Sequence, residues 1–292
     1  MFSSCKSKKE KSLYLAGWEV SFDGDAQCHR FIQTQAVDQT TANSVYAGIE
    51  LVFKKDRLIK AFNIEEGVKT ERELSPEELN LNYPDVRENQ IYRLTTTVRS
   101  NSYLGGKPSE EFHMPKFEFI APFQYIGCFS KQDEVFDWLP FDLELVAPIY
   151  LNINQLFIDY SDPMHPKVID VERLANTDTS YEALKPDSKI VFERVNFKAY
   201  KSRDFSCELG HTGVPNWIQY PDIPVSPKNN KTMRLVCQLP SNVGVMTQST
   251  NVKPEDKWSK RYFEQMNFWG DGDLFVFFEP ESKVACVMIQ NT

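Results

Sequence analysis

The sequence has few of the residues that metal and redox sites need. It contains four histidines and six cysteines in 292 residues, and no two cysteines form a Cys-x-x-Cys pair. Structural zinc sites need closely spaced ligands of these types, which are missing here. Six widely separated cysteines in a chain without a secretion signal are typical of reduced thiols. We therefore predict neither a metal nor a cofactor.

Long apolar runs are also absent. No run approaches the ~20 residues that span a bilayer, and residues 1–12 are basic, without the apolar core of a signal peptide. Phe2 stands where N-myristoylation requires glycine. Cys5 among lysines leaves a lipid-plus-basic anchor open, but we interpret residues 1–12 as a disordered basic tail. The sequence thus predicts a cytoplasmic protein without a membrane partner.

Basic residues are fewer than acidic residues. The chain has 33 Lys and Arg against 41 Asp and Glu, a formal net charge of −8. This balance argues against nucleic acid as the main partner, because phosphate binding needs a cationic face. Glycine is scarce, at 12 residues, whereas aromatic residues reach 13%. The composition therefore indicates an acidic, globular and β-rich protein.

Strand-like patterns dominate the chain. Alternating or β-branched and aromatic segments predict strands at residues 13–22, 30–37, 45–54, 57–64, 91–98, 117–126, 188–200, 233–239, 273–279 and 283–290. Short helices are predicted at residues 75–79, 130–139, 168–175, 181–185 and 253–266. Because no regular βαβα alternation appears, the sequence predicts an α+β fold with mostly antiparallel sheets and few short helices.

A faint internal repeat bears on the domain organisation. Gly106-Lys-Pro108 is followed by Gln124 in an apolar run, and Gly213-Val-Pro215 is followed by Gln238 in another. Two related half-sheets would explain this pattern, and so would coincidence. We predict a single domain over residues 13–292, within which residues 13–165 and 188–292 are candidate sub-units.

The usual catalytic and metal-binding motifs are missing. There is no phosphate-binding loop, no dinucleotide fingerprint and no nucleophile elbow. The turn at 270–273 begins like a calcium loop but lacks the downstream glutamate. Asp159, Asp162 and His165 are weak metal candidates, since a spacing of three suits a shared cation on a helix. Two prolines in this segment forbid a regular helix, so a turn capped by Asp162 is the preferred interpretation.

The C-terminal third carries the most specific pattern. A segment His211-Thr-Gly-Val-Pro-Asn-Trp-Ile-Gln219 precedes a proline-bounded loop and the strand Met233-Arg-Leu-Val-Cys-Gln238. The turn Phe268-Trp-Gly-Asp-Gly272 then feeds an aromatic strand, and Met288-Ile-Gln290 lies near the end. Over about residues 209–292 this combination resembles the YwqG-like family of bacterial proteins.

The resemblance implies an α+β fold with two related halves. It implies no reaction, because none is established for that family. Many members carry a Cys-x-x-Cys-like knuckle in the proline-bounded loop, where this chain has Val225-Ser-Pro-Lys-Asn-Asn-Lys231. The metal that such a knuckle would hold is therefore not expected here.

The polar and aromatic side chains of this third are the candidate binding residues: His211, Trp217, Gln219, Gln238, Asp271 and Gln290. A buried amide without a hydrogen bond costs roughly 1–3 kcal/mol. In the structural interpretation, the glutamines and Asp271 tie loops to the sheet. In the functional alternative, His211, Gln219 and Asp271 line a cleft around a ligand.

Two functions follow from these observations. The first is a non-enzymatic binding or protein-interaction module, of which an immunity-type protein that neutralises a basic toxin is one form. The alternative is a small-ligand enzyme or hydrolase with His211 as a base in the cleft. No nucleophile is evident in the sequence, which favours the first.

Overall fold

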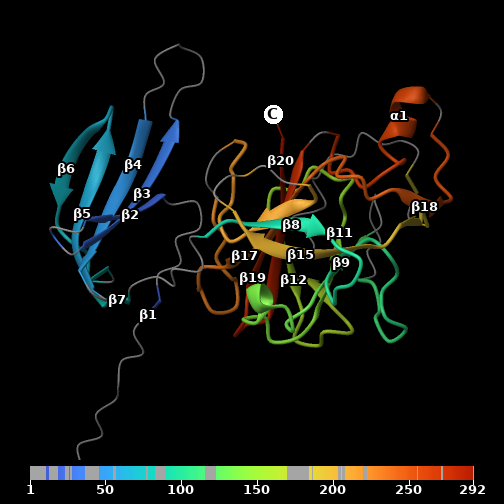
Figure 1. The fold of residues 1–292 in the computed structure, drawn as a ribbon, viewed down its shortest axis with the longest axis horizontal. Helices are drawn as coiled ribbons and strands as arrows, with labels where there is room; N and C mark the ends of the chain where they lie inside the picture. The colour runs from blue at the N-terminus through green and yellow to red at the C-terminus, as the bar shows by residue number, and fades with distance from the viewer. Residues whose placement is uncertain are drawn as a thin grey trace, which may run out of the picture. The chain divides into compact units, whose positions relative to one another are not determined.

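Two compact units make up the chain, residues 1–89 and residues 90–292. The computed structural model describes residues 11–12, 19–23, 26, 28–36, 46–54, 57–76, 78–82, 90–115, 123–169, 184–185, 187–202, 205, 208–219, 222–254, 256–270 and 272–291. The sequence left open whether the first ninety residues complete a larger sheet. They form a sheet of their own (Figure 1).

The sheet of the first unit is built around a long antiparallel meander. Its strands are β1 (Lys11–Ser12), β2 (Glu19–Asp23), β3 (Cys28–Ala36), β4 (Tyr46–Lys54), β5 (Arg57–Glu65), β6 (Val68–Arg72) and β7 (Leu81–Asn82). They lie in the order β1-β7-β5-β4-β3-β2, with β6 also paired to β5. Alternation puts Phe31, Leu51, Phe53 and Ala61 on one face, where they form the unit's small core.

The opposite face of this sheet holds a buried carboxylate. Glu50 on β4 is fully buried and forms ion pairs with Arg30 on the adjacent β3 and with Lys69 on β6, two strands away. Two cations compensate the charge, as a buried carboxylate requires.

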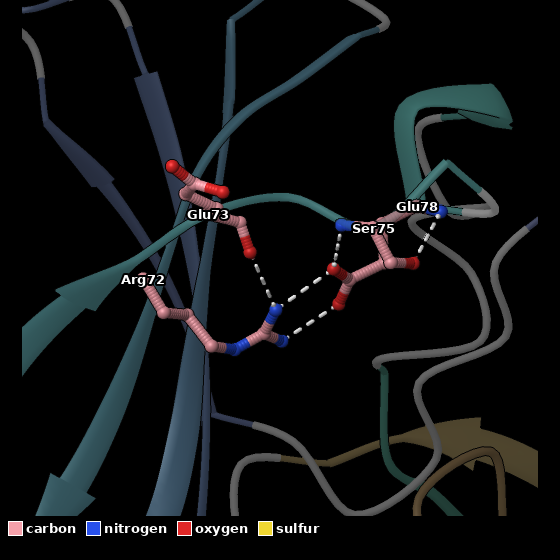
Figure 2. A network of polar contacts seen from close by, with 4 residues as sticks. All are labelled: Arg72, Glu73, Ser75 and Glu78. Atoms are coloured by element: carbon pink, nitrogen blue, oxygen red, sulfur yellow. Dashed lines mark hydrogen bonds and ion pairs between the residues drawn. The ribbon is translucent and has the colours of Figure 1, made fainter.

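A compact polar network follows β6 (Figure 2). Arg72 donates two hydrogen bonds to the carboxylate of Glu78, at 2.8 and 2.6 Å. Ser75 and Glu78 form a reciprocal capping box: each accepts from the other's backbone N–H. The helix predicted at 75–79 is reduced to a single 3₁₀ turn at Glu78–Asn80.

The second unit contains an eleven-stranded sheet among its described residues. Its strands are β8 (Tyr92–Thr96), β9 (Tyr103–Leu104), β10 (Gln124–Phe129), β11 (Leu143–Ala147), β12 (Leu156–Asp159), β13 (Lys167–Ile169), β15 (Val195–Lys201), β16 (Gly210–Thr212), β17 (Arg234–Pro240), β19 (Asp273–Glu279) and β20 (Val284–Gln290). A separate ribbon pairs β14 (Ile190–Phe192) with β18 (Thr247–Thr250).

The strand order of this sheet is symmetric about its β8–β15 pair. The order is β11-β10-β9-β15-β8-β16-β17-β19-β20-β12-β13. The part of this order from β11 to β19 reads the same in the opposite direction when β8 is exchanged with β15, β9 with β16, β10 with β17 and β11 with β19. The first strand of each half is also inserted into the other half, since β9 pairs with β15 and β16 pairs with β8.

The two faces of the sheet are both buried over much of their area. The inner face packs into the main core, which includes Leu94, Phe197, Val276 and Val287. The sheet curls far enough for Tyr160, just after β12, to donate its hydroxyl to the backbone carbonyl of Glu144 on the β11 edge. The outer face of β17, β19 and β20 carries a second apolar cluster.

The α+β prediction is wrong. The described part of the chain is nearly all β, with 45% of residues in strands and 4% helical, and its one α-helix is α1 (Lys257–Arg261). The helix predicted over 253–266 stops early because the chain turns back to pair with another segment: the Met266 N–H donates to the Val245 carbonyl at 2.8 Å. The helix predicted over 130–139 shrinks to a 3₁₀ turn at Glu134–Phe136.

Local signals explain these errors: capping residues predicted the helices at 75–79 and 130–139, and the helical period of residues 253–266 predicted the third. A cap satisfies the first backbone N–H groups of a turn, but a short helix still needs packing to propagate. In the described region 167–169, the beginning of a predicted helix forms β13 instead. The rest of that helix, most of the one at 181–185, and residues 1–10 of the predicted tail lie outside the described residues. No helix in the described part of the chain has the length and apolarity to cross a membrane.

Candidate functional site

A long loop, which we call the second strap (residues 213–219 and 222–233), crosses the outer face of β17, β19 and β20. Trp217 lies flat on this face, stacked on Phe275 (ring centroids 5.2 Å apart) and on Phe277 (5.9 Å). The face is apolar because alternate residues of β19 and β20 point outward and are large and hydrophobic. The stacking fixes the middle of the strap on the sheet.

Two glutamines fasten the strap by its backbone. Gln238 on β17 accepts from the Asn216 N–H (2.7 Å) and donates back to the Asn216 carbonyl (2.8 Å). Gln290 on β20 accepts from the N–H groups of Ile218 (3.1 Å) and Gln219 (3.2 Å). These are the contacts that the structural interpretation requires of amides buried in strands.

Gln219 and Asp271 have different outcomes. The Gln219 side chain is exposed and donates to the backbone carbonyl of Asn291 at 2.9 Å. Asp271 lies outside the described residues. The carboxylate that joins the network is Asp273 at the start of β19, whose Oδ2 accepts from Gln238 Nε2 at 2.6 Å. Burial raises the pKa of Asp273, and the bond from Gln238 offsets part of that rise.

Asp273 is not among the residues predicted for the site, although the sequence carries a signal for it. The alternation of residues 273–279 puts Asp273 on the same face as Phe275 and Phe277, which is the face that the strap covers. The second aspartate of the Gly-Asp-Gly-Asp turn therefore had the register of a sheet residue.

His211 lies on β16 beside Gln238, its direct cross-strand neighbour. It is 3% exposed, and the ring of Phe205 packs edge-on against it at 5.0 Å. Burial lowers the pKa of His211 from 6.5 to about 4; the nearby polar groups of Val214 and Gln238 offset only part of that effect. The imidazole is therefore neutral at physiological pH.

Two side chains in this region carry nitrogen atoms that have no hydrogen-bond partner in the described part of the chain. Among the described residues, no hydrogen bond reaches either ring nitrogen of His211 or the indole nitrogen of Trp217, although all three atoms are buried. Neighbouring Thr212 donates its hydroxyl to the Leu235 carbonyl and is not aligned with the imidazole. The described geometry thus contains a neutral base without an adjacent nucleophile.

The weak metal candidates do not converge. Asp159 forms an ion pair with Lys228 of the second strap at 2.6 Å, whereas Asp162 contacts His165 Nδ1 at 3.0 Å. The ring of His165 stacks on His113 at 4.5 Å. Within the described residues, no three metal-ligating side chains gather around one point. Asp162 also accepts from the Met164 N–H, which is the capped turn that the prolines predict.

A first strap (residues 105–115 in its described part) crosses β10 and β11 in the other half of the sheet. The N–H of Ser109 donates to Glu144 Oε1 at 3.3 Å, and the hydroxyl of Tyr125 donates to Glu144 Oε2 at 2.5 Å. Phe112 of the strap packs edge-on against Tyr125 at 6.3 Å. Ser109 follows Pro108 as Asn216 follows Pro215, so each strap is held one residue after its proline.

Comparisons with known proteins add no identity. No protein-family model, no curated protein and no solved structure matches the chain. The resemblance of residues 209–292 to the YwqG-like family therefore stays a prediction.

Proposed function

We propose that this chain is a non-enzymatic, cytoplasmic protein-interaction module, related to the YwqG-like proteins. The observation that carries the proposal is the use of the candidate amides. The side-chain oxygens of Gln238 and Gln290 accept hydrogen bonds from backbone N–H groups of the second strap, and the Gln219 side chain donates to the Asn291 carbonyl. Groups engaged in this way hold a surface in shape and are not available to a substrate.

The electrostatics of His211 support the same proposal. A general base works best with a pKa near the operating pH, whereas burial holds the pKa of His211 at about 4. An immunity-type role against a basic toxin is one form that this function takes, because the chain carries a net charge of −8.

Quantitative co-purification from the native host, followed by mass spectrometry, tests the proposal. Wild-type chain should recover a defined protein partner, and a His211→Leu/Gln219→Ala variant should recover the same partner in the same amount. An unrelated acidic protein carrying the same tag is the control. Recovery of no partner above that control contradicts the proposal.

One observation favours the alternative of a small-ligand site. The unpartnered nitrogens of His211 and Trp217 are donors or acceptors that a small polar ligand could satisfy. NMR of ¹⁵N-labelled protein distinguishes the two functions during a fragment screen. A compound that shifts both the Trp217 indole and the His211 ring signals supports the ligand site. If no compound in the screen shifts either signal, the result argues against the ligand site.

A further inference from the structure

The outer face of the β8–β15 pair differs from the rest of the sheet. The first strap is fastened over β10 and β11, and the second over β17, β19 and β20. Between them, Arg93, Lys198 and Tyr200 are exposed, with Tyr200 at 53%. Among the described residues, no hydrogen bond, ion pair or ring contact engages any of these three side chains.

Register places these side chains together. Tyr200 is the direct cross-strand partner of Arg93, and Lys198 is the partner of Thr95. All four point away from the core, because the intervening Leu94 and Ala199 pack inward. We call Arg93, Thr95, Lys198 and Tyr200 the basic face.

The charge of this face is opposite to that of the chain. The outward positions of β8 and β15 hold two cations and no carboxylate, in a chain of net charge −8. Arg194, just before β15, adds a third cation at one end, where its guanidinium lies 3.6 Å from the centroid of the Tyr103 ring. The described Glu208 near the end of β8 accepts from Thr96, which belongs to the inward register.

We propose that the basic face is the docking surface for an acidic segment of a partner protein. This inference rests on the proposed interaction module in its general form, not on the form that neutralises a basic toxin, and it names the surface and the chemistry of the partner. Carboxylates complement the free cations, which steers encounter and fixes register. Arg and Tyr are enriched among the residues that dominate protein interfaces. Thr95 adds a buried hydroxyl that has no partner among the described residues.

A binding measurement with defined probes tests the surface. Fluorescence anisotropy of a labelled poly-glutamate peptide should report binding to the wild-type chain, weakening as salt rises. Arg93→Glu/Lys198→Glu should weaken this binding at least about tenfold. The matched control Lys167→Glu/Lys253→Glu makes the same charge change at exposed lysines elsewhere and should change the affinity less than about twofold. Thermal unfolding verifies that both variants fold.

Three results would overturn the inference. The wild-type chain does not bind poly-glutamate, both double variants weaken binding equally, or a single-stranded DNA probe binds the basic face more tightly than the peptide. The co-purification separates this failure from that of the proposed function. Equal recovery of one partner by wild type and by Arg93→Glu/Lys198→Glu rejects the basic face but retains the interaction module, whereas recovery of no partner by wild type rejects the module.

Discussion

The first and second straps begin in the same way. Gly105 and Gly213 both adopt positive φ angles, and a Cβ at either would overlap a backbone carbonyl oxygen, that of Glu193 or Gln90. Each strap then places a proline and is held at the next residue. They differ in what holds them: a buried carboxylate, Glu144, in the first half and a buried amide, Gln238, in the second.

The difference follows from what each anchor must satisfy. Glu144 receives two donors and gives no hydrogen bond: the Ser109 N–H reaches Oε1 and the Tyr125 hydroxyl reaches Oε2, which suits the two acceptor oxygens of a carboxylate. Gln238 receives one donor and gives two hydrogen bonds, so it needs both halves of an amide. The same loop geometry can thus be stabilised by either group, provided that the donors and acceptors around it match.

Substitution of the strap glycines should have the largest effect. Gly213→Ala should destabilise the second unit by at least about 4 kcal/mol, because the added Cβ meets backbone that cannot move aside. Gly105→Ala should cause a similar loss of stability through the first half of the sheet. Gly244→Ala is the control, since Gly244 also has positive φ but nothing lies near its Cβ position. Denaturant unfolding measures all three, and equal losses at Gly244 and Gly213 would contradict the expectation.

Exchange of the anchor chemistry should have the next largest effect. Gln238→Glu should cost about 3 kcal/mol, because it places a carboxylate against Asp273 and removes the donor. Glu144→Gln should cost only about 1–2 kcal/mol, since one buried donor loses its acceptor. Adding Asp273→Asn to Gln238→Glu should recover stability by restoring a donor. Urea titrations measure the free energy of unfolding of each variant. A larger loss of stability for Glu144→Gln than for Gln238→Glu would contradict the expected difference between the two anchors.

Acid should weaken the second half through His211. Its folded pKa of about 4 lies below the ordinary 6.5, so the unfolded chain binds the proton more readily. The stability that the neutral ring contributes is present above pH 6.5 and is lost as the pH falls towards 4. Between pH 7 and 5 this loss should be about 2 kcal/mol. A His211→Leu variant should show a flatter pH profile in calorimetry, and an unchanged slope would contradict the assignment.

The smallest effect is expected from the aromatic contact of the second strap. Trp217→Phe should cost about 1 kcal/mol or less, because a phenyl ring still stacks on Phe275 and the unpartnered indole nitrogen disappears. Trp217→Ala is the matched comparison and should cost more, because the whole ring that stacks on Phe275 and Phe277 is lost. Chemical unfolding followed by circular dichroism avoids the change in tryptophan fluorescence. Equal losses in the two variants would show that stacking does not matter.

Strand positions were predictable because period-two patterns are local. Residues 273–279 form β19 as predicted, and the strand predicted at 283–290 becomes β20 (Val284–Gln290). The α+β class was wrong because capping signals such as Ser75-Pro-Glu-Glu mark the start of a turn without specifying its length. What ended these helices was tertiary pairing, as at Met266 and Val245, which no local pattern contains.

The candidate site was predictable in part. Gln238 and Gln290 were identified from amides in apolar runs, and both contact the second strap. The repeat pattern paired Gln124 with Gln238. In the structure, Gln238 on β17 lies opposite His211 on β16, whereas the residue of β10 that lies opposite Leu104 on β9 is Gly127 and not Gln124. Glu144 was missed because its partners, Ser109 and Tyr125, are distant in sequence, so only the folded sheet brings them together.

The insertion of β8 between β15 and β16 has a consequence for synthesis on the ribosome. Neither neighbour of this strand has been translated when it emerges, and the strands that follow it directly do not pair with it. The backbone N–H and C=O groups along both edges of β8 therefore stay unpaired until the second half of the sheet is made. This delay makes folding slow and the nascent chain prone to aggregation. A chaperone that shields this early strand would raise the yield of correctly folded protein.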